Sequence, residues 1–177
     1  MDIIPSYDIE KINLKKYNKK TRKIILSNLK NYTKLNYFHC PACNLTELPD
    51  LPNSLKYLNC DSNKLTELPD LPNSLFILHC SNNNLTELPD LPNLYNTLIG
   101  LYCCGNNLTK LPNLPNSLTG LYCANNKLTK LPDLPNSLTH LYCFNNKLTK
   151  LPDLPNSLEY LDYHNNNLTE LLDLPDT

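Results

Sequence analysis

Residues 114–133 read LPNSLTGLYCANNKLTKLPD, and the next 20 residues repeat this stretch with two substitutions. Related copies give seven units in all, at 31–50, 51–70, 71–90, 91–113, 114–133, 134–153 and 154–173. The unit at 91–113 is longer than the others, with Leu94, Tyr95 and Asn96 as the apparent insertion. A fixed period of this length is typical of a solenoid whose units stack on one another. The chain therefore divides into an N-terminal segment, residues 1–30, and a repeat domain, residues 31–177, that ends in a short tail.

Each unit carries the pattern L-x-x-L-x-C-x-x-N-x-L, for example between Leu118 and Leu128. This is the leucine-rich repeat pattern. Alternate side chains of a strand face opposite ways, so the second leucine and the cysteine point inward and their neighbours point outward. The prolines of the following L-P-x-L-P segment favour extended, polyproline-II-like backbone over helix. The sequence thus predicts a leucine-rich repeat solenoid with a parallel β-sheet on its concave face and an extended convex face.

The short period and the L-P-x-L-P segments resemble the bacterial-type repeats of the YopM and IpaH effectors. The resemblance covers residues 31–175 and implies a short N-terminal helical cap. IpaH-type effectors also carry a ligase domain after their repeats. Leu174 and Pro175 begin an eighth unit that stops at once, so we do not transfer that activity. The Lys-, Asn- and Ile-rich composition is also similar to that of leucine-rich repeat proteins of giant DNA viruses.

Two columns of the pattern are expected to be structural. An amide buried at the asparagine position can pair with backbone groups of its own turn and of the neighbouring turn. A cysteine at the inward strand position acts as a small apolar side chain in a ladder. The two columns are Asn63, Asn83, Asn106, Asn126, Asn146 and Asn166, and Cys40, Cys60, Cys80, Cys103, Cys123 and Cys143.

The remaining cysteines are Cys43 and Cys104. Cys40 and Cys43 form a lone C-x-x-C, which would suit half of a zinc site or a redox pair. Both fall on positions of the repeat pattern and no second pair has a suitable spacing, so a structural role is favoured. Cys104 falls on an outward position and is the expected reactive thiol. The start of the chain lacks the apolar segment of a signal peptide, so we expect an intracellular protein with free thiols.

The composition excludes several classes of protein. The chain has 177 residues, a net charge of -1 and 3 glycines, which argues against strongly basic nucleic-acid binders and glycine-rich phosphate loops. No apolar run approaches the ~20 residues of a membrane helix. The chain contains no H-E-x-x-H motif and no paired set of C-x-x-C motifs. We therefore expect no enzymatic activity, no catalytic residue, no metal site and no cofactor.

The N-terminal segment differs from the repeats in charge. Residues 1–34 hold nine basic and three acidic residues, whereas the rest of the chain is net acidic. Apolar residues spaced among the lysines of residues 10–35 predict one or two short amphipathic helices. Because a solenoid needs a cap over its first unit, we interpret residues 1–30 as a basic helical cap. The alternatives are a basic surface for anionic partners or membranes, and a degenerate F-box-like set of adaptor helices.

The outward strand positions form the expected partner-binding face. They vary between units whose other positions barely change, and they hold all 4 histidines and six of the 11 tyrosines. Tyrosine offers a large, stiff contact surface with a polar tip, although its β-propensity alone would also place it in a sheet. The candidate residues are Tyr37, His39, Tyr57, His79, Tyr102, Tyr122, His140, Tyr142, Phe144, Tyr160 and His164.

Two further features bear on association. A convex column changes sign, from Glu47, Glu67 and Glu87 to Lys110, Lys130 and Lys150 and back to Glu170, and it would orient a partner or keep the surface soluble. In the last unit Tyr163 replaces the ladder cysteine and Leu172 replaces the expected proline. A strand edge left open there would give a weak end-to-end homodimer, whereas a Tyr163 plug would give a monomer.

These patterns favour a non-enzymatic protein–protein interaction module that binds a partner on its concave face. We expect a viral or bacterial factor that acts on host proteins in the host cytoplasm. Two alternatives stay open. One is a substrate adaptor that recruits a ubiquitin-ligase component through its N-terminal helices, and the other is a structural protein that assembles through its ends. In each case the expected partner is a protein, and we expect no nucleic-acid partner and no membrane-spanning segment.

Overall fold

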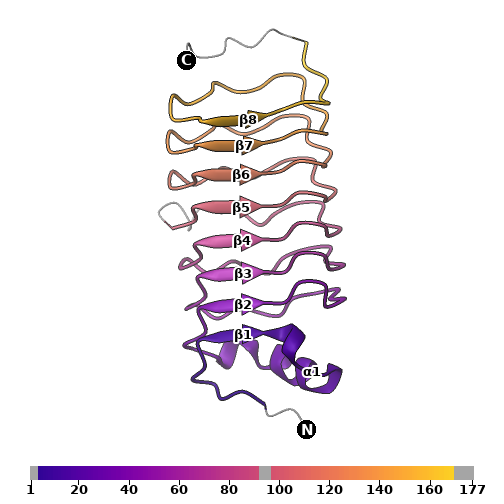
Figure 1. Ribbon diagram of the computed structural model, residues 1–177, viewed down its shortest axis with the longest axis vertical. Coiled ribbons are helices and arrows are strands. Elements are labelled where there is room, and N and C mark those ends of the chain that lie inside the picture. Colours follow the sequence, from indigo (N-terminus) through magenta and orange to yellow (C-terminus); the bar gives the residue numbers. More distant parts are fainter. Residues whose placement is uncertain (1–3, 92–96, 170–177) are drawn as a thin grey trace.

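The computed structural model describes residues 4–91 and 97–169. Eight short parallel strands in these residues form one sheet in chain order, and extended limbs return behind it (Figure 1). The predicted leucine-rich repeat solenoid with a parallel sheet and a short helical cap is confirmed. The strands are β1 (Lys11–Asn13), β2 (Tyr37–His39), β3 (Tyr57–Asn59), β4 (Ile77–His79), β5 (Gly100–Tyr102), β6 (Gly120–Tyr122), β7 (His140–Tyr142) and β8 (Tyr160–Asp162).

The strands pair without any shift of register from one turn to the next. Leu101 lies beside Leu121, and Leu121 lies beside Leu141. All three side chains are fully buried. A fully buried leucine contributes roughly 1.5–3 kcal/mol relative to an exposed one, so this column is stable only when its neighbours are present. The core is therefore a stack of equivalent layers that runs the length of the sheet.

The first strand, β1, was not predicted, because residues 1–30 were expected to contain only the helical cap. Its central residue, Ile12, pairs with Phe38 of β2, and both are fully buried. Ile9, Ile12 and Leu14 follow the spacing of the first three pattern residues, with Leu14 at the cysteine position. The asparagine and the prolines of the pattern do not follow, so the repeat pattern does not predict this degenerate copy. The cap thus extends the sheet as well as covering it.

One α-helix, α1 (Lys19–Ser27), covers the first turn, flanked by the 3₁₀-helices η1 (Leu14–Lys16) and η2 (Leu29–Asn31). The side chain of Asn18 accepts a hydrogen bond of 2.9 Å from the backbone N–H of Thr21, which caps the helix. Ile25 on its inner face is fully buried. Because the helix closes the core of the first repeat, it does the work expected of a solenoid cap.

Each turn after a strand of the repeats contains a residue with positive φ. Asparagine occupies this position in several turns, as at Asn125 and Asn145, because it tolerates the left-handed region. Gly105 has φ 64°, and a Cβ atom there would lie 2.6 Å from the side-chain oxygen of Asn82. Both the backbone conformation and the limited space therefore favour glycine in the turn after β5.

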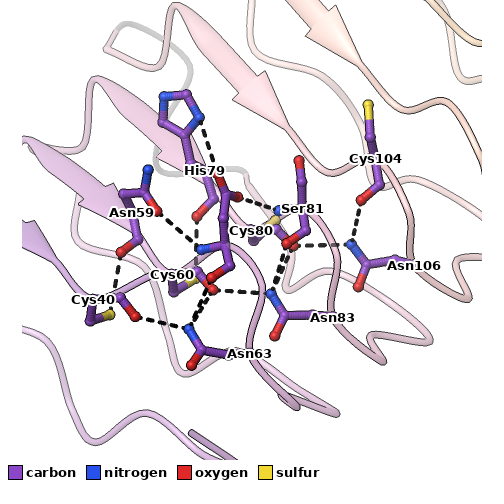
Figure 2. A network of polar contacts seen from close by, with 11 residues as sticks. Cys40, Asn59, Cys60, Asn63, His79, Cys80, Ser81, Asn83, Cys104 and Asn106 are labelled. Carbon is purple, nitrogen blue, oxygen red and sulfur yellow. Dashed lines mark hydrogen bonds and ion pairs between the residues drawn. The ribbon is translucent and has the colours of Figure 1, made fainter. Parts of the chain in front are cut away.

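The asparagine column bridges neighbouring turns. The amide nitrogen of Asn126 donates to the carbonyl oxygens of Cys103 and Cys123, both at 3.0 Å. Its oxygen accepts the N–H of Leu108 at 3.0 Å. The same three kinds of contact recur along the column, and Figure 2 shows the amide donation for Asn63, Asn83 and Asn106. Asn146 and Asn166 repeat them.

The six ladder cysteines are fully buried, and all eight cysteines of the chain are free. The thiol of Cys60 donates to the carbonyl of His79 at 3.3 Å, so it bonds the neighbouring turn. Burial, with a smaller effect of Asp162, raises the pKa of Cys143 to about 12. Burial raises the pKa of Cys103 still further. These thiols are therefore protonated apolar fillers at neutral pH.

Two thiols are partly exposed, whereas only Cys104 was predicted to be accessible. Burial raises the pKa of both Cys43 and Cys104. The positive charges of Arg22 and Lys15 oppose this rise at Cys43, while the negative charge of Asp61 adds to it at Cys104. Cys43 takes the asparagine position of the first repeat, which lies at the surface beside the cap. A backbone hydrogen bond of Ala124 also opposes the rise of the pKa at Cys104, so burial is partly offset at both thiols.

The C-terminal end of the described sheet is less well covered than the middle. In β8 the ring of Tyr160 is 55% exposed, and Tyr163 packs only partly buried against the core. The sequence features at Glu170, Leu172 and Leu174 lie outside the described residues, as does the insertion at Leu94, Tyr95 and Asn96. The homodimer and the monomer therefore both stay predictions.

Replacement of the buried amide should cost the solenoid much of its stability. Asn126→Ala leaves the N–H of Leu108 without its partner and removes one of the two amide donors to each of the carbonyls of Cys103 and Cys123, so the free energy of unfolding should fall by about 1–3 kcal/mol. Urea denaturation followed by circular dichroism measures it. Lys127→Ala, at the exposed neighbouring position, is the control and should change the value by less than about 0.5 kcal/mol. Equal effects of the two changes would contradict a bridging role of the amide.

Thiol alkylation should separate the two classes of cysteine. Under native conditions iodoacetamide should modify Cys43 and Cys104, because access limits the reaction and these two thiols are the partly exposed ones. The six ladder thiols should react only in denaturant. Peptide mass spectrometry after timed quenching gives each rate. Native modification of Cys123 as fast as that of Cys104, or a disulfide between ladder neighbours, would show that the ladder is not a sealed, reduced column.

Candidate partner-binding face

The eleven candidate residues share one side of the sheet, spread over β2 to β8 and the turns that follow β7 and β8. Most are partly exposed, and Tyr160 and His164 are more than half exposed. They stand at outward positions because the inward positions of the same strands are taken by the buried leucines and cysteines. The structure thus places all the candidates on one continuous surface, the concave face.

A column of stacked rings runs along this face. Tyr37 and Tyr57 stack with their ring centroids 4.4 Å apart, and a tilted contact of 5.5 Å joins Tyr57 to His79. The column then continues from His79 to Tyr102 at 4.1 Å, from Tyr102 to Tyr122 at 4.4 Å and from Tyr122 to Tyr142 at 4.9 Å. The spacing of hydrogen-bonded strands, about 4.8 Å, places rings at stacking distance when the register does not shift. We call these six residues the aromatic column.

The remaining candidates form short stacks beside the column. His39 lies 6.1 Å from Tyr37, between ring centroids. His140 stacks on Tyr160 at 4.6 Å, and Phe144 stacks on His164 at 4.7 Å. No candidate residue is therefore isolated, and the aromatic surface broadens toward the C-terminal end.

Two glycines support the centre of the column. A Cβ atom on Gly100 would lie 3.0 Å from the ring of Tyr102, and one on Gly120 would lie 3.0 Å from the ring of Tyr122. These rings therefore lean across the backbone of their own strands. Both glycines are buried beneath the rings. A larger residue would push each ring outward, so the glycines set the height of the column.

Asp61 is a candidate functional residue that was not predicted from the sequence. Its carboxylate accepts a hydrogen bond of 2.6 Å from the backbone N–H of Ser81 and lies 3.8 Å from Nδ1 of His79. Figure 2 shows His79, the last residue of β4, and Ser81, which follows shortly after it in the chain. Burial raises the pKa of Asp61, although the Ser81 hydrogen bond opposes the rise. Burial lowers the pKa of His79 and of His39, and Asp61 partly offsets this.

An apolar patch at the start of β4 and β5 was also missed. Phe76 is 46% exposed, and Ile77 and Ile99 are partly exposed. Ile77 pairs in register with Gly100, next to the ring of Tyr102. The signal was present in the sequence, since Phe76 and Ile99 replace polar residues at equivalent positions of other repeats. This patch widens the contact surface around the middle of the column.

The described part of the chain contains no cluster of metal ligands and no helix that could span a membrane. Within residues 4–91 and 97–169, no group of three or more His, Cys, Asp or Glu side chains is arranged to hold a metal ion. The C-x-x-C pair is divided, because Cys40 is fully buried in the ladder and Cys43 is partly exposed. In the same ranges no helix has the length and hydrophobicity needed to cross a bilayer.

Comparisons with known sequences identify the repeats. The family model described as "Leucine Rich repeats (2 copies)" matches residues 116–156. The model described as "Leucine Rich Repeat" matches residues 54–75. A search of curated proteins gave no significant match.

Comparisons with solved structures extend the similarity to most of the chain. The leucine-rich repeat domain of a Shigella effector is 35% identical with a TM-score of 0.76, over 86% of this chain and 69% of that one. YopM from Yersinia enterocolitica WA-314 is 35% identical with a TM-score of 0.66, over 81% of this chain. The functional domain of InlJ from Listeria monocytogenes, which includes a cysteine ladder, is 36% identical with a TM-score of 0.63, also over 81%.

The chain is shorter than these proteins, since it spans 36% of the YopM chain and 33% of the InlJ chain. From the similarity to the Shigella effector domain over more than two thirds of its length, the chain belongs to the leucine-rich repeat family, in its bacterial type.

Proposed function

We propose that this protein is an interaction module that binds a protein partner on its concave face. The observation that carries the proposal is the aromatic column, in which partly exposed rings contact one another from β2 to β7, in stacks joined by the tilted contact of Tyr57 with His79. Rings that are held by their neighbours lose little conformational freedom on binding, which is why aromatic side chains dominate the energy of many interfaces. A partner that covers the column removes their apolar faces and edges from water.

The centre of the interface is Tyr102, Tyr122 and Tyr142, flanked by the patch of Phe76, Ile77 and Ile99. The three rings combine an apolar body with a hydroxyl, so the partner segment that lies over them needs both apolar side chains and hydrogen-bonding groups. Asp61 and the histidines add polar contacts on the N-terminal side. A mixed surface of this kind suits a folded protein or an extended peptide better than a nucleic acid, because it carries no cluster of lysine or arginine.

We further propose that the module is non-enzymatic and acts on host proteins inside cells, as a bacterial or viral factor. The support is the similarity to YopM of Yersinia pestis, described as a leucine-rich effector protein, and to the Shigella effector domain. The free thiols of the ladder are consistent with a reducing compartment. The partly buried Tyr163 supports a monomer in solution, with the weak end-to-end homodimer as the alternative.

The adaptor alternative has less support. It requires a set of N-terminal helices that a ligase component can recognise. The described residues of the cap contain one α-helix of 9 residues, and its apolar face is used to cover the first repeat. The side of the helix that stays exposed carries mainly charged side chains.

Loss of the central rings should abolish partner capture. The triple change of Tyr102, Tyr122 and Tyr142 to alanine removes three anchors, each worth on the order of 2 kcal/mol. Affinity capture from host-cell lysate, read by quantitative mass spectrometry, compares it with the wild type. A convex triple change of Lys110, Lys130 and Lys150 to alanine is the matched control and should keep the captured set. Unchanged capture by the tyrosine variant, with its circular dichroism spectrum intact, would place the binding site elsewhere.

Binding should also respond to acidification. Because burial lowers the pKa of His39 and His79, their imidazoles stay neutral at neutral pH and gain charge only below the usual range for histidine. The affinity for a partner identified by capture should therefore change little from about pH 7.5 to 6.5 and more between about 6.5 and 5.5. His79→Gln should flatten this response. A flat profile for the wild type, or an unaltered profile for the variant, would mean that this part of the face does not contact the partner.

A further inference from the structure

A groove of about 930 Å³ lies between helix α1 and the first repeat, away from the residues of the concave face. One wall is the exposed side of α1, with Lys19, Arg22 and Lys23. The opposite wall is the segment between Cys43 and Pro49, with apolar side chains at Leu45 and Leu48. Grooves of this volume accommodate several side chains of a ligand.

The positive charge on the helical wall lacks compensation within the protein. Lys19, Arg22 and Lys23 are spaced by three and four residues, so they share one side of α1, where like charges destabilise the helix. The first turn of α1 contains no acidic residue, although the helix dipole favours one there. In the described ranges, none of these three side chains forms an ion pair with an acidic group. Glu47 is the acidic residue that lines the groove.

The position of the central cation is fixed by the cap itself. Nε of Arg22 donates to the carbonyl of Tyr17 at 2.7 Å, and Nη2 donates to the carbonyl of Lys15 at 3.2 Å. These bonds hold the guanidinium at the rim of the groove while leaving further N–H groups for a ligand. A fixed donor loses little freedom when it binds a carboxylate. The groove therefore presents one ordered and two flexible cations above an apolar floor.

We propose that this groove is a second docking site, and that its occupant is an extended acidic segment of a partner protein that also carries leucine side chains. The acidic groups would pair with Lys19, Arg22 and Lys23, and the leucines would cover the partly exposed Leu26 and Leu45. The charge complementarity is local, because the repeats that follow are net acidic and would repel the same segment elsewhere. The basic cap therefore attracts an acidic segment more strongly than the net-acidic repeats do as a whole.

The two partly exposed cysteines provide a built-in test. Cys43 lines the groove, whereas Cys104 lies on the concave face. The probe is a fluorescein-labelled peptide of about twelve residues that alternates aspartate or glutamate with leucine, and its control replaces every acid by the corresponding amide. Fluorescence anisotropy gives the affinity, and timed iodoacetamide labelling of the full chain reports which thiol the bound peptide protects.

The double change Lys19→Glu with Lys23→Glu should weaken binding of the acidic peptide at least about tenfold, and Lys19→Gln with Lys23→Gln should weaken it less. Lys127→Glu with Lys147→Glu makes the same charge change on exposed repeat positions and should stay within about twofold of the wild type. Bound peptide should slow the alkylation of Cys43 and leave that of Cys104 unchanged. Melting curves confirm that each variant is folded.

Several results would overturn the proposal. They are absence of saturable binding up to about 1 mM peptide, equal binding of the amide peptide, or protection of Cys104 in place of Cys43. Protection of Cys43 by phosphatidylserine vesicles but not by the peptide would assign the groove to a membrane surface. The concave-face variant of Tyr102, Tyr122 and Tyr142 should retain peptide binding, so a failure of the groove and a failure of the concave site remain distinguishable.

Discussion

The bridging asparagine of each turn is the interaction on which the other features of this protein depend. The amide of Asn126 bonds backbone groups of its own turn and of the turn before it. Because these bonds join fixed backbone positions, they permit only one register between neighbouring strands. The unshifted register then places every outward side chain above its counterpart, about one strand spacing away. The rings of the concave face thus lie at stacking distance because the buried amides of the turns fix the register of the strands.

The sequence predicts most of this arrangement because residues at the same position of successive repeats lie side by side in the folded protein. Once the pattern assigns Leu121 and Cys123 to the interior, Tyr122 must face outward, and the same holds in every unit. What spacing does not predict is the lateral packing of side chains. The lean of Tyr102 over Gly100 and the approach of Asp61 to His79 depend on rotamers. Column membership could therefore be predicted, whereas the contacts within a column could not.

The missed strand β1 has a different cause. Ile12 and Leu14 satisfy the inward positions, but Tyr17 takes the place of the bridging asparagine, and α1 replaces the outer limb. A strand at the end of a solenoid has a neighbour on one side only, so its sequence is under fewer constraints than the strands within the stack. Periodicity is weakest where the molecule ends. The groove beside α1 arises at this departure from the repeat.

The first repeat shows how the cap replaces one member of the asparagine column. Each asparagine bonds its own turn and the turn before it, and Asn63 accepts the N–H groups of both Cys43 and Leu45 in the turn before it. An asparagine at position 43 would in turn serve the cap, where Arg22 already bonds two carbonyls. Position 43 holds a partly exposed cysteine where the later repeats have the bridging asparagine. The guanidinium of Arg22, which bonds two carbonyls of the cap, also stands at the rim of the groove. Arg22 thus supplies the fixed positive charge of the groove at the end of the solenoid where the repeat pattern is lost.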